Sequence, residues 1–119
     1  MKLLIVDDST MIRKMIERSL TEKNFTLAGS VADGEEALSI FKETLPDLVT
    51  MDIAMPKMDG ITALEEMLKI KSDAKILMIT SQTDTASATE ALGKGAVGYL
   101  GKPFTAAQII EKVNEVLGL

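Results

Sequence analysis

The chain has 119 residues, 46% of them hydrophobic and only 3% aromatic, which predicts one domain with an aliphatic core. It contains no cysteine and no histidine, which excludes disulfides, thiolate chemistry and the usual zinc or copper ligands, so any metal is expected to have oxygen ligands. The net charge of -5 argues against direct nucleic-acid binding, and no apolar stretch approaches the roughly 20 residues that span a membrane; we expect a soluble, cytoplasmic protein.

Apolar runs of strand length alternate with segments of helical periodicity along the whole chain. In chain order the predicted elements are a strand over Lys2–Val6, a helix over Ser9–Thr21, a strand over Thr26–Val31, a helix over Gly34–Glu43, a strand over Asp47–Asp52, a helix over Gly60–Lys69, a strand over Lys75–Thr80, a helix over Thr83–Lys94, a strand over Val97–Gly101 and a helix over Thr105–Leu117. This alternation predicts an α/β fold, a flavodoxin-like, doubly wound parallel sheet of five strands in the order 2-1-3-4-5.

The predicted fourth helix differs from the others in composition. It carries Thr83, Thr85, Ser87 and Thr89, and its only large apolar residue is Leu92. Hydroxyl residues weaken a helix interior and small side chains bury little area, so we expect this helix to be the least stable of the five. The alternative is an ordinary edge helix.

Charged residues stand at the ends of three predicted strands. Asp7 and Asp8 follow the first strand, Asp52 ends the third, and Lys102 follows the fifth. Ligands of such sheets bind beyond the carboxyl ends of the strands, near the switch point between the first and third, so we expect these side chains to converge. Three carboxylates and one ammonium leave a formal charge of -3 + 1 = -2, which Mg²⁺, or Mn²⁺ in its place, would balance. The pattern predicts a magnesium-assisted, phosphoryl-accepting site with Asp52 as the acceptor.

Each of these residues also has a purely structural interpretation. Asp52 alone could cap a strand, and either Asp7 or Asp8 could cap the following helix. Thr80 could donate its hydroxyl to a phosphoryl oxygen, although a β-branched residue is ordinary at a strand end. Lys102 could be a solvated lysine; the Pro that follows it favours extended or turn backbone and permits a cis bond.

The predicted first helix has an unusually wide apolar face. Its large apolar residues cover about 180°, more than the ~100° that core burial requires. We expect Met11, Ile12 and Met15 to stay exposed beside the acidic pocket, where flexible methionines suit a docking surface. The alternative is a more deeply buried helix.

The segments LLIVDDS, MDIAMPKMDG, ILMITS and GAVGYLGKPF occur in this order, and with them the chain resembles the receiver domain of two-component response regulators from Lys2 to Leu117. The resemblance implies that a histidine kinase phosphorylates Asp52 and that Thr80 and Lys102 hold the phosphoryl group. It also implies that Tyr99 turns inward when Thr80 moves toward the phosphoryl group. The implied Mg²⁺ ligands are Asp7, Asp8, Asp52 and the backbone carbonyl of Ala54.

The resemblance also implies a cis bond between Lys102 and Pro103, a turn at Asp59-Gly60 and two partner surfaces. The kinase surface would comprise the first helix and the loop after the fifth strand, with Met11, Ile12, Arg13, Met15, Pro103 and Phe104. The output surface would comprise the fourth helix, fifth strand and fifth helix, around Tyr99, Lys94 and Gln108. By the same resemblance, Ala54 and Gln82 flank the acceptor at positions where receiver domains often tune phosphate lifetime. The two residues give opposing indications of the phosphate lifetime: the Gln82 side chain could orient an attacking water, whereas Ala54 has no polar side chain. The lifetime therefore stays open.

We therefore expect residues 1–119 to form a single receiver domain that assists its own phosphorylation and dephosphorylation without being a conventional enzyme. A single-domain, chemotaxis-type regulator is favoured over a receiver excised from a larger transcriptional or enzymatic regulator. A magnesium phosphohydrolase is a less favoured alternative, because such enzymes usually carry a second Asp at the position where this chain has Ala54. A flavin- or nucleotide-binding loop would not place Asp7-Asp8 against a phosphate, and a degenerate receiver conflicts with the intact acidic, hydroxyl and lysine positions.

Overall fold

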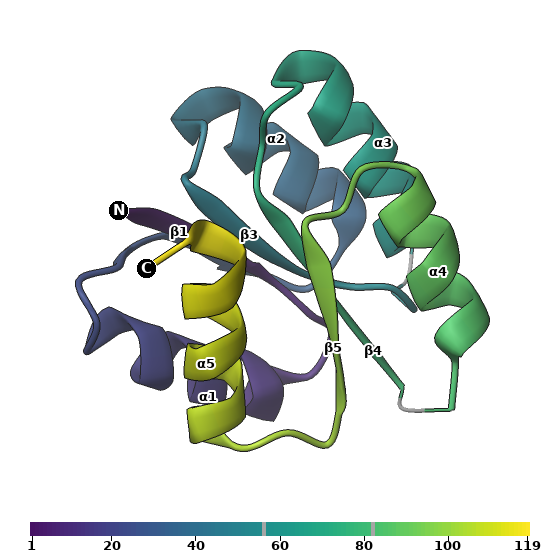
Figure 1. Ribbon diagram of the computed structural model, residues 1–119. Coiled ribbons are helices and arrows are strands. Elements are labelled where there is room, and N and C mark those ends of the chain that lie inside the picture. Colours follow the sequence, from purple (N-terminus) through teal and green to yellow (C-terminus); the bar gives the residue numbers. More distant parts are fainter. Residues whose placement is uncertain (56, 82) are drawn as a thin grey trace.

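A parallel sheet lies at the centre of the molecule, with its strands in the order β2-β1-β3-β4-β5, as the sequence predicts (Figure 1). The computed structural model describes residues 1–55, 57–81 and 83–119. The strands are β1 (Lys2–Val6), β2 (Thr26–Val31), β3 (Leu48–Asp52), β4 (Ile76–Ser81) and β5 (Gly98–Lys102). The helices are α1 (Thr10–Thr21), α2 (Gly34–Thr44), α3 (Gly60–Ile70), α4 (Thr85–Gly93) and α5 (Ala106–Leu117).

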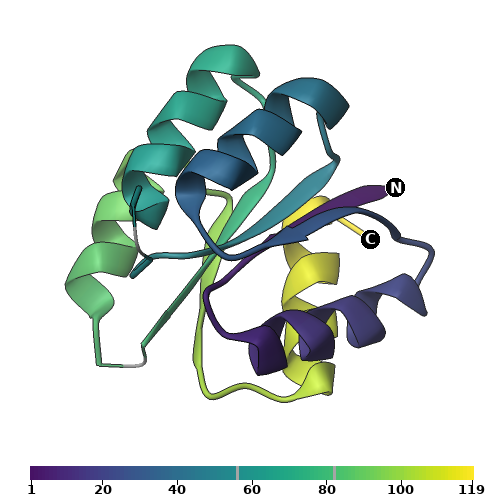
Figure 2. The same ribbon diagram turned by 180° about the vertical axis from the view of Figure 1, so that it is seen from behind.

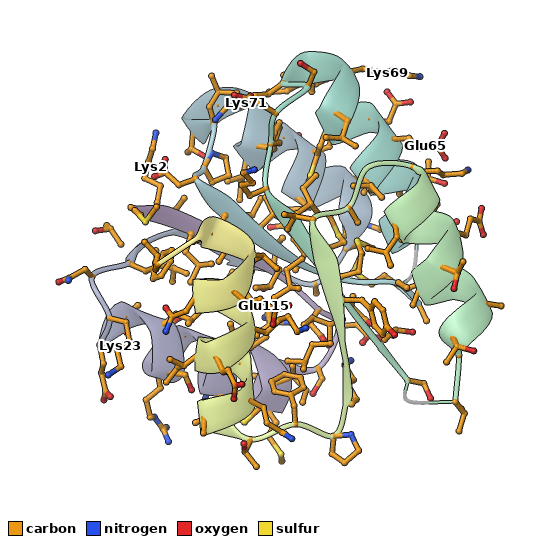
Figure 3. All side chains as sticks on the ribbon, viewed as in Figure 1. Lys2, Lys23, Glu65, Lys69, Lys71 and Glu115 are labelled. Carbon is orange, nitrogen blue, oxygen red and sulfur yellow. The ribbon has the colours of Figure 1, made fainter. Side chains whose placement is uncertain are left out.

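Helices cover both faces of the sheet, as Figures 1 and 2 show from opposite sides. The helices α2, α3 and α4 pack on one face around Phe41, Leu64 and Met67, and α1 and α5 pack on the other around Ile16 and Ile109. Burying each of these large side chains contributes about 1.5–3 kcal/mol. The lysines Lys2, Lys23 and Lys69 project from the rim into solvent in Figure 3. No helix of the described ranges is both long and apolar enough to cross a membrane.

Side chains at the helix starts set the helix boundaries. Five helices are preceded by a residue whose side chain accepts the backbone N–H three positions later, and these caps are Ser9, Asp33, Asp59, Asp84 and Thr105. Helices α1 and α5 therefore begin one residue after their expected starts, because the expected first residues, Ser9 and Thr105, are the caps. The expectation that the fourth helix starts at Thr83 is wrong: it starts at Thr85, because the Asp84 carboxylate accepts the N–H of Ser87.

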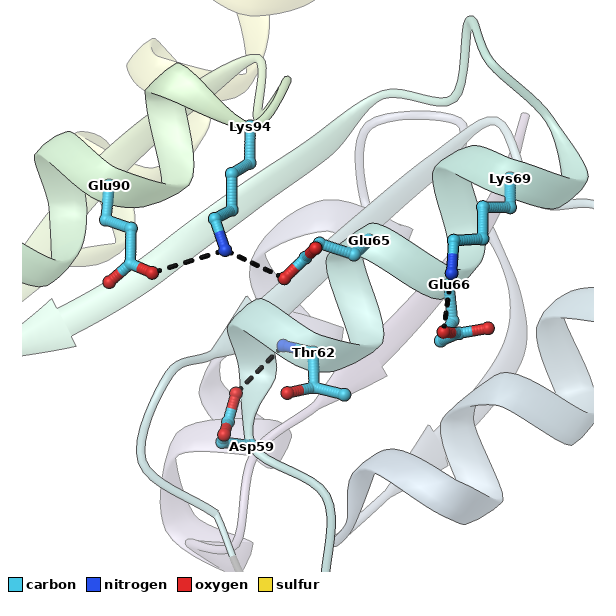
Figure 4. A network of polar contacts seen from close by, with 7 residues as sticks. All are labelled: Asp59, Thr62, Glu65, Glu66, Lys69, Glu90 and Lys94. Carbon is cyan, nitrogen blue, oxygen red and sulfur yellow. Dashed lines mark hydrogen bonds and ion pairs between the residues drawn. The ribbon is translucent and has the colours of Figure 1, made fainter.

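Helix α4 has the smallest buried face, since Ala88 and Ala91 are its buried residues. Its C-terminal end is joined to α3 by an ion pair in which Lys94 Nζ lies 2.9 Å from Glu65 Oε1 (Figure 4). The same nitrogen lies 3.3 Å from Glu90 Oε2 within α4. This small burial is what the composition indicates, and the low stability of the helix stays a prediction.

Candidate functional site

Strand register brings the acidic residues together at the carboxyl edge of the sheet. Val6 of β1 pairs with Met51 of β3, so the residues that follow, Asp7 and Asp52, lie side by side. Asp7 is fully buried and Asp52 is 5% exposed, whereas Asp8 is exposed. One carboxylate oxygen from each of the three residues lies within 4.8 Å of the others. The expected convergence of the carboxylates is therefore present.

The carboxylates do not act as helix caps, which was the structural alternative. Ser9 caps α1, and Asp7 Oδ1 instead accepts the backbone N–H of Ser9 at 2.8 Å. The buried Asp7 Oδ2 lies 2.9 Å from Lys102 Nζ and has no other polar partner among the described residues. A buried carboxylate oxygen with a single partner can bind a further cation.

Lys102 ends β5 and reaches across β4 to the carboxylates. Its Nζ lies 3.5 Å from Asp52 Oδ1 in addition to its contact with Asp7. Burial opposes the charge of this ammonium, but the hydrogen bond to Asp7 and the charges of both aspartates outweigh burial, so the pKa of Lys102 is raised. The lysine is therefore a fixed positive charge beside the acceptor.

The Asp52 carboxyl has an unusual protonation equilibrium. Burial, followed by the negative charge of Asp7, raises its pKa from 3.8 to about 6, although Lys102 acts in the opposite direction. Asp8 adds a smaller increase. One lysine thus compensates the acidic cluster incompletely, and a hard dication fits the oxygen donors and the residual charge.

Asp52 opens onto a cavity of about 540 Å³ that also reaches the expected docking residues. Besides the acceptor, the cavity is lined by Asp8, Ile12, Ala54, Ser81, Lys102 and Pro103. The structure therefore brings the predicted acceptor, two further residues of the predicted metal-ligand set (Asp8 and Ala54) and two predicted partner-binding residues (Ile12 and Pro103) to one opening. The small side chains of Ala54 and Ser81 are both exposed there.

The predicted switch residues flank a second cavity of about 370 Å³ on the β4–β5 side. Thr80 is 4% exposed and pairs with Gly101 of β5, while Tyr99 is 41% exposed. Thr80, Tyr99, Pro103 and Gln108 all line the cavity. The two predicted switch residues therefore border the same cavity, and the inward turn of Tyr99 stays a prediction.

The expected kinase surface is less uniform than the sequence indicates. Met11 is 79% exposed, but Ile12 and Met15 are half-buried against the core under α1. Phe104 is 8% exposed and packs in that core, so its ring does not lie on the surface and only Pro103 of the pair is exposed. The arc of α1 is partly covered because α5 packs beside it.

One contact at the site was not foreseen. The Arg13 guanidinium donates to the backbone carbonyl of Asp7 at 2.6 Å, so this side chain braces the loop after β1 as well as bordering the expected docking surface. Arg13 stands six residues after Asp7, in the first turn of α1, and this spacing was the available sequence signal for the contact. The cis bond between Lys102 and Pro103 is confirmed, and Asp59 caps α3. Gln82 lies outside the described residues.

Comparison with known proteins identifies the family and the fold of the chain. The pattern of the response regulator receiver domain matches residues 3–114. Protein CcdB of Bacillus subtilis is 41% identical, with 98% of each chain covered. The chemotaxis protein CheY of Thermotoga maritima is 39% identical over 97% of this chain and 96% of that protein.

A solved structure extends the likeness to three dimensions. The crystal structure of the CheX-CheY-BeF3-Mg²⁺ complex from Borrelia burgdorferi contains a chain that superimposes with a TM-score of 0.92 and 36% identity, covering 98% of this chain and 88% of that chain. Sequence pattern, relatives and strand order agree with one another. The chain therefore belongs to the response regulator receiver domain family, the phosphorylation-activated switches of two-component signalling, and within it resembles the chemotaxis type.

Proposed function

We propose that Asp52 is the residue that accepts the phosphoryl group, and that its donor is a histidine kinase. The observation that carries this proposal is the cluster itself: carboxylate oxygens of Asp7, Asp8 and Asp52 lie within 4.8 Å of one another, and the Lys102 ammonium lies 3.5 Å from Asp52. Asp8, Asp52 and Lys102 also line one open cavity. A carboxylate in that position can form an acyl phosphate.

The transfer is a displacement at phosphorus. A carboxylate oxygen of Asp52 forms the new P–O bond, the bond from phosphorus to the donor's nitrogen breaks, and the nitrogen leaves with its electron pair. Asp52 has to be ionised to attack, which its pKa of about 6 allows at neutral pH. Lys102 lies where its charge would pair with a phosphoryl oxygen, and the Thr80 hydroxyl at the end of β4 is the proposed second donor.

Asp7, Asp8, Asp52 and the backbone carbonyl of Ala54 are the proposed ligands of Mg²⁺, with Mn²⁺ as a substitute. The fit is supported by the oxygen-only donor set and by the buried Asp7 Oδ2, which has a single partner. When bound, the ion would neutralise charge on the carboxylates and on the incoming phosphoryl oxygens. The related CheY from Borrelia burgdorferi was crystallised with Mg²⁺ and BeF3, which supports this assignment.

The kinase is proposed to dock over α1 and the loop after β5. Met11 and Pro103 supply exposed apolar surface there, Ile12 and Met15 lie half-buried beside it, and Arg13 contributes charge at the rim. The output is proposed to leave through α4, β5 and α5, where Tyr99 would enter the cavity beside Thr80 as the latter moves toward the phosphoryl group. A downstream protein would recognise the altered surface.

A cytoplasmic, single-domain regulator that assists its own phosphorylation and dephosphorylation completes the proposal. Relatives of nearly the same length, CcdB and CheY, support the single-domain assignment. The length of the native gene tests it directly, because a receiver excised from a larger regulator would be followed by further coding sequence.

The test of the acceptor uses intact-mass spectrometry after incubation with acetyl phosphate and Mg²⁺. Wild type should gain one phosphoryl group, Asp52→Asn should gain none, and Asp73→Asn, an exposed aspartate distant from the site in sequence, should label like wild type. Labelling of Asp52→Asn at the wild-type level would exclude this residue as the acceptor.

A further inference from the structure

Helices α2 and α3 begin with the same dipeptide, Asp-Gly. Asp33 and Asp59 are the caps, and their carboxylates accept backbone N–H groups at 2.9 and 2.8 Å respectively. Gly34 and Gly60 are the first helical residues, and both are buried. Neither glycine has a left-handed backbone, so an alanine could adopt the same φ and ψ at either position. The need for glycine there must come from what surrounds the missing Cβ.

Gly60 lies directly on the backbone of the proposed acceptor. A Cβ atom at this position would be 2.1 Å from the carbonyl oxygen of Asp52 and 2.8 Å from Cα of Ile53. The Gly60 N–H also donates to the carbonyl of Ile53 at 2.8 Å. Because the obstructing atoms belong to the backbone, no side-chain rotation relieves the overlap, and an added methyl group has to displace β3 or α3.

Gly34 makes the corresponding contact with the other end of the segment that follows Asp52. A Cβ atom at Gly34 would be 2.4 Å from the carbonyl oxygen of Met58 and 2.9 Å from its Cβ. Beside it, Lys57 Nζ lies 3.6 Å from Asp33 Oδ2, which adds a weak ion pair between the same two segments. We name residues 53–55 and 57–59 the acceptor loop. Ile53, at the start of this loop, lies against Gly60, and Met58, close to its end, lies against Gly34.

The acceptor loop carries groups that need exact placement. Ala54 lines the same cavity as Asp52, and its carbonyl is a proposed metal ligand. A displacement of about 1 Å in a reacting or ligating group can reduce a rate by about 100-fold. Contact with bare backbone on two sides restricts the loop more tightly than contact with flexible side chains would.

We propose that Gly34 and Gly60 are positioning residues for phosphoryl acceptance, whose bare backbones clamp the acceptor loop and fix Asp52 and Ala54 against Asp7 and Asp8. The proposal rests on Asp52 being the acceptor and adds to it a role for two helix starts that touch no substrate. Of the two, Gly60 touches the Asp52 peptide itself, so its replacement has the larger effect.

The chain offers a matched control in Gly93, the last residue of α4. Gly93 is exposed, and a Cβ added there meets no described atom within 4 Å. Alanine is the better helix former, so helix propensity alone predicts that all three Gly→Ala changes stabilise the protein. The clamp predicts stabilisation or no change for Gly93→Ala alone. A second control, Val113→Ala, makes a cavity in the core under α1 and α5 and lowers the melting temperature away from the loop.

The experiment measures initial phosphorylation rates by acetyl phosphate with Mg²⁺, at a temperature where circular dichroism shows every variant to be folded. We expect Gly60→Ala to lose about 10- to 100-fold in rate and Gly34→Ala about 3- to 10-fold. Gly93→Ala and Val113→Ala should react like wild type. The second readout is independent of phosphorylation: the Mg²⁺ concentration that gives half of the maximal thermal shift should rise for the two clamp variants and stay unchanged for both controls.

Gly60→Ala that reacts and responds to Mg²⁺ like wild type would overturn the proposal, as would a loss in Val113→Ala equal to that in Gly60→Ala at matched stability. If Gly60→Ala does not fold, Gly34→Ala decides by the same two readouts. Absence of labelling in wild type would contradict the proposed acceptor instead, and the Mg²⁺ titrations would still compare the clamp variants with their controls.

Discussion

Replacing Asp52 by Asn should stabilise the metal-free protein at neutral pH. Asp52 is 5% exposed, and its carboxylate adjoins those of Asp7 and Asp8. Among the described residues, its only compensating charge is the Lys102 ammonium, 3.5 Å away. Asparagine has nearly the same shape and carries no charge. The substitution therefore removes electrostatic repulsion while leaving the packing in place.

The magnitude follows from the pKa of Asp52, which burial and Asp7 raise from 3.8 to about 6. A rise of about 2 pKa units corresponds to about 3 kcal/mol between the two protonation states. Because water reaches part of the carboxylate through the open cavity, we expect about 1.5 to 3 kcal/mol for Asp52→Asn at pH 7.5.

The sign with pH is fixed by linkage. The folded state binds the Asp52 proton more tightly than the unfolded state, so ionisation of this group destabilises the fold. The cost is absent below pH 3.8, grows as the pH rises toward 6, and is constant above it. The stability difference between Asp52→Asn and wild type should therefore fall by about half between pH 7.5 and pH 5.

The assay is urea denaturation followed by circular dichroism at several pH values, in EDTA and at low ionic strength. Asp73→Asn, an exposed aspartate, is the control and should show no gain that depends on pH. A stability difference for Asp52→Asn that is negative at pH 7.5, or that stays the same at every pH, would refute the account of crowded charges.

Three further predictions follow from other parts of the structure. Mg²⁺ at ten times its dissociation constant should raise the unfolding free energy of wild type by about 1.4 kcal/mol, and Asp8→Asn should need more metal for the same thermal shift; equal titrations would argue against Asp8 as a ligand. Lys94→Gln removes the ion pair between α3 and α4 and should speed hydrogen exchange in α4, whereas Lys69→Gln, which removes a pair inside α3, should not; equal exchange in the two variants would contradict this role. Thr50→Val removes a fully buried hydroxyl that has no partner among the described residues and should stabilise the protein by about 1 kcal/mol in urea denaturation; a loss of stability would reveal a partner for that hydroxyl.

The strand order and the meeting of the charged residues could be predicted because both depend on patterns that extend along the chain. Strands buried on both faces have to be continuously apolar, as in LLIV and ILMI, and their polar ends then mark one edge of the sheet. Once Asp7 and Asp52 end neighbouring strands, parallel register makes their proximity unavoidable. Helix starts were less certain, since Thr83 and Thr85 are equally suitable residues and only the carboxylate of Asp84 decides between them.

Contacts between elements distant in sequence could not be predicted in the same way. Phe104 reads as a loop residue beside Pro103, but the turn after β5 directs its ring into the core under α1 and α5. The closeness of Gly34 to Met58 depends on how α2 and α3 pack, which no local pattern contains. The repeated Asp-Gly at the two helix starts was the sequence signal, and its meaning emerges only when both starts are seen to touch the acceptor loop.

Helix α4 should respond more readily than the other described helices to charge added at the proposed acceptor Asp52, because less apolar surface holds it to the sheet. On one face α1 and α5 bury Ile16, Leu20 and Ile109, whereas α4 on the other face buries alanines. The free energy of local opening rises with buried apolar area, so we expect α4 to be the helix that costs least to move. It also follows β4, the strand whose end carries Thr80. The ion pair of Lys94 with Glu65 joins the C-terminal end of α4 to α3, and for that reason its removal tests how firmly α4 is held in place.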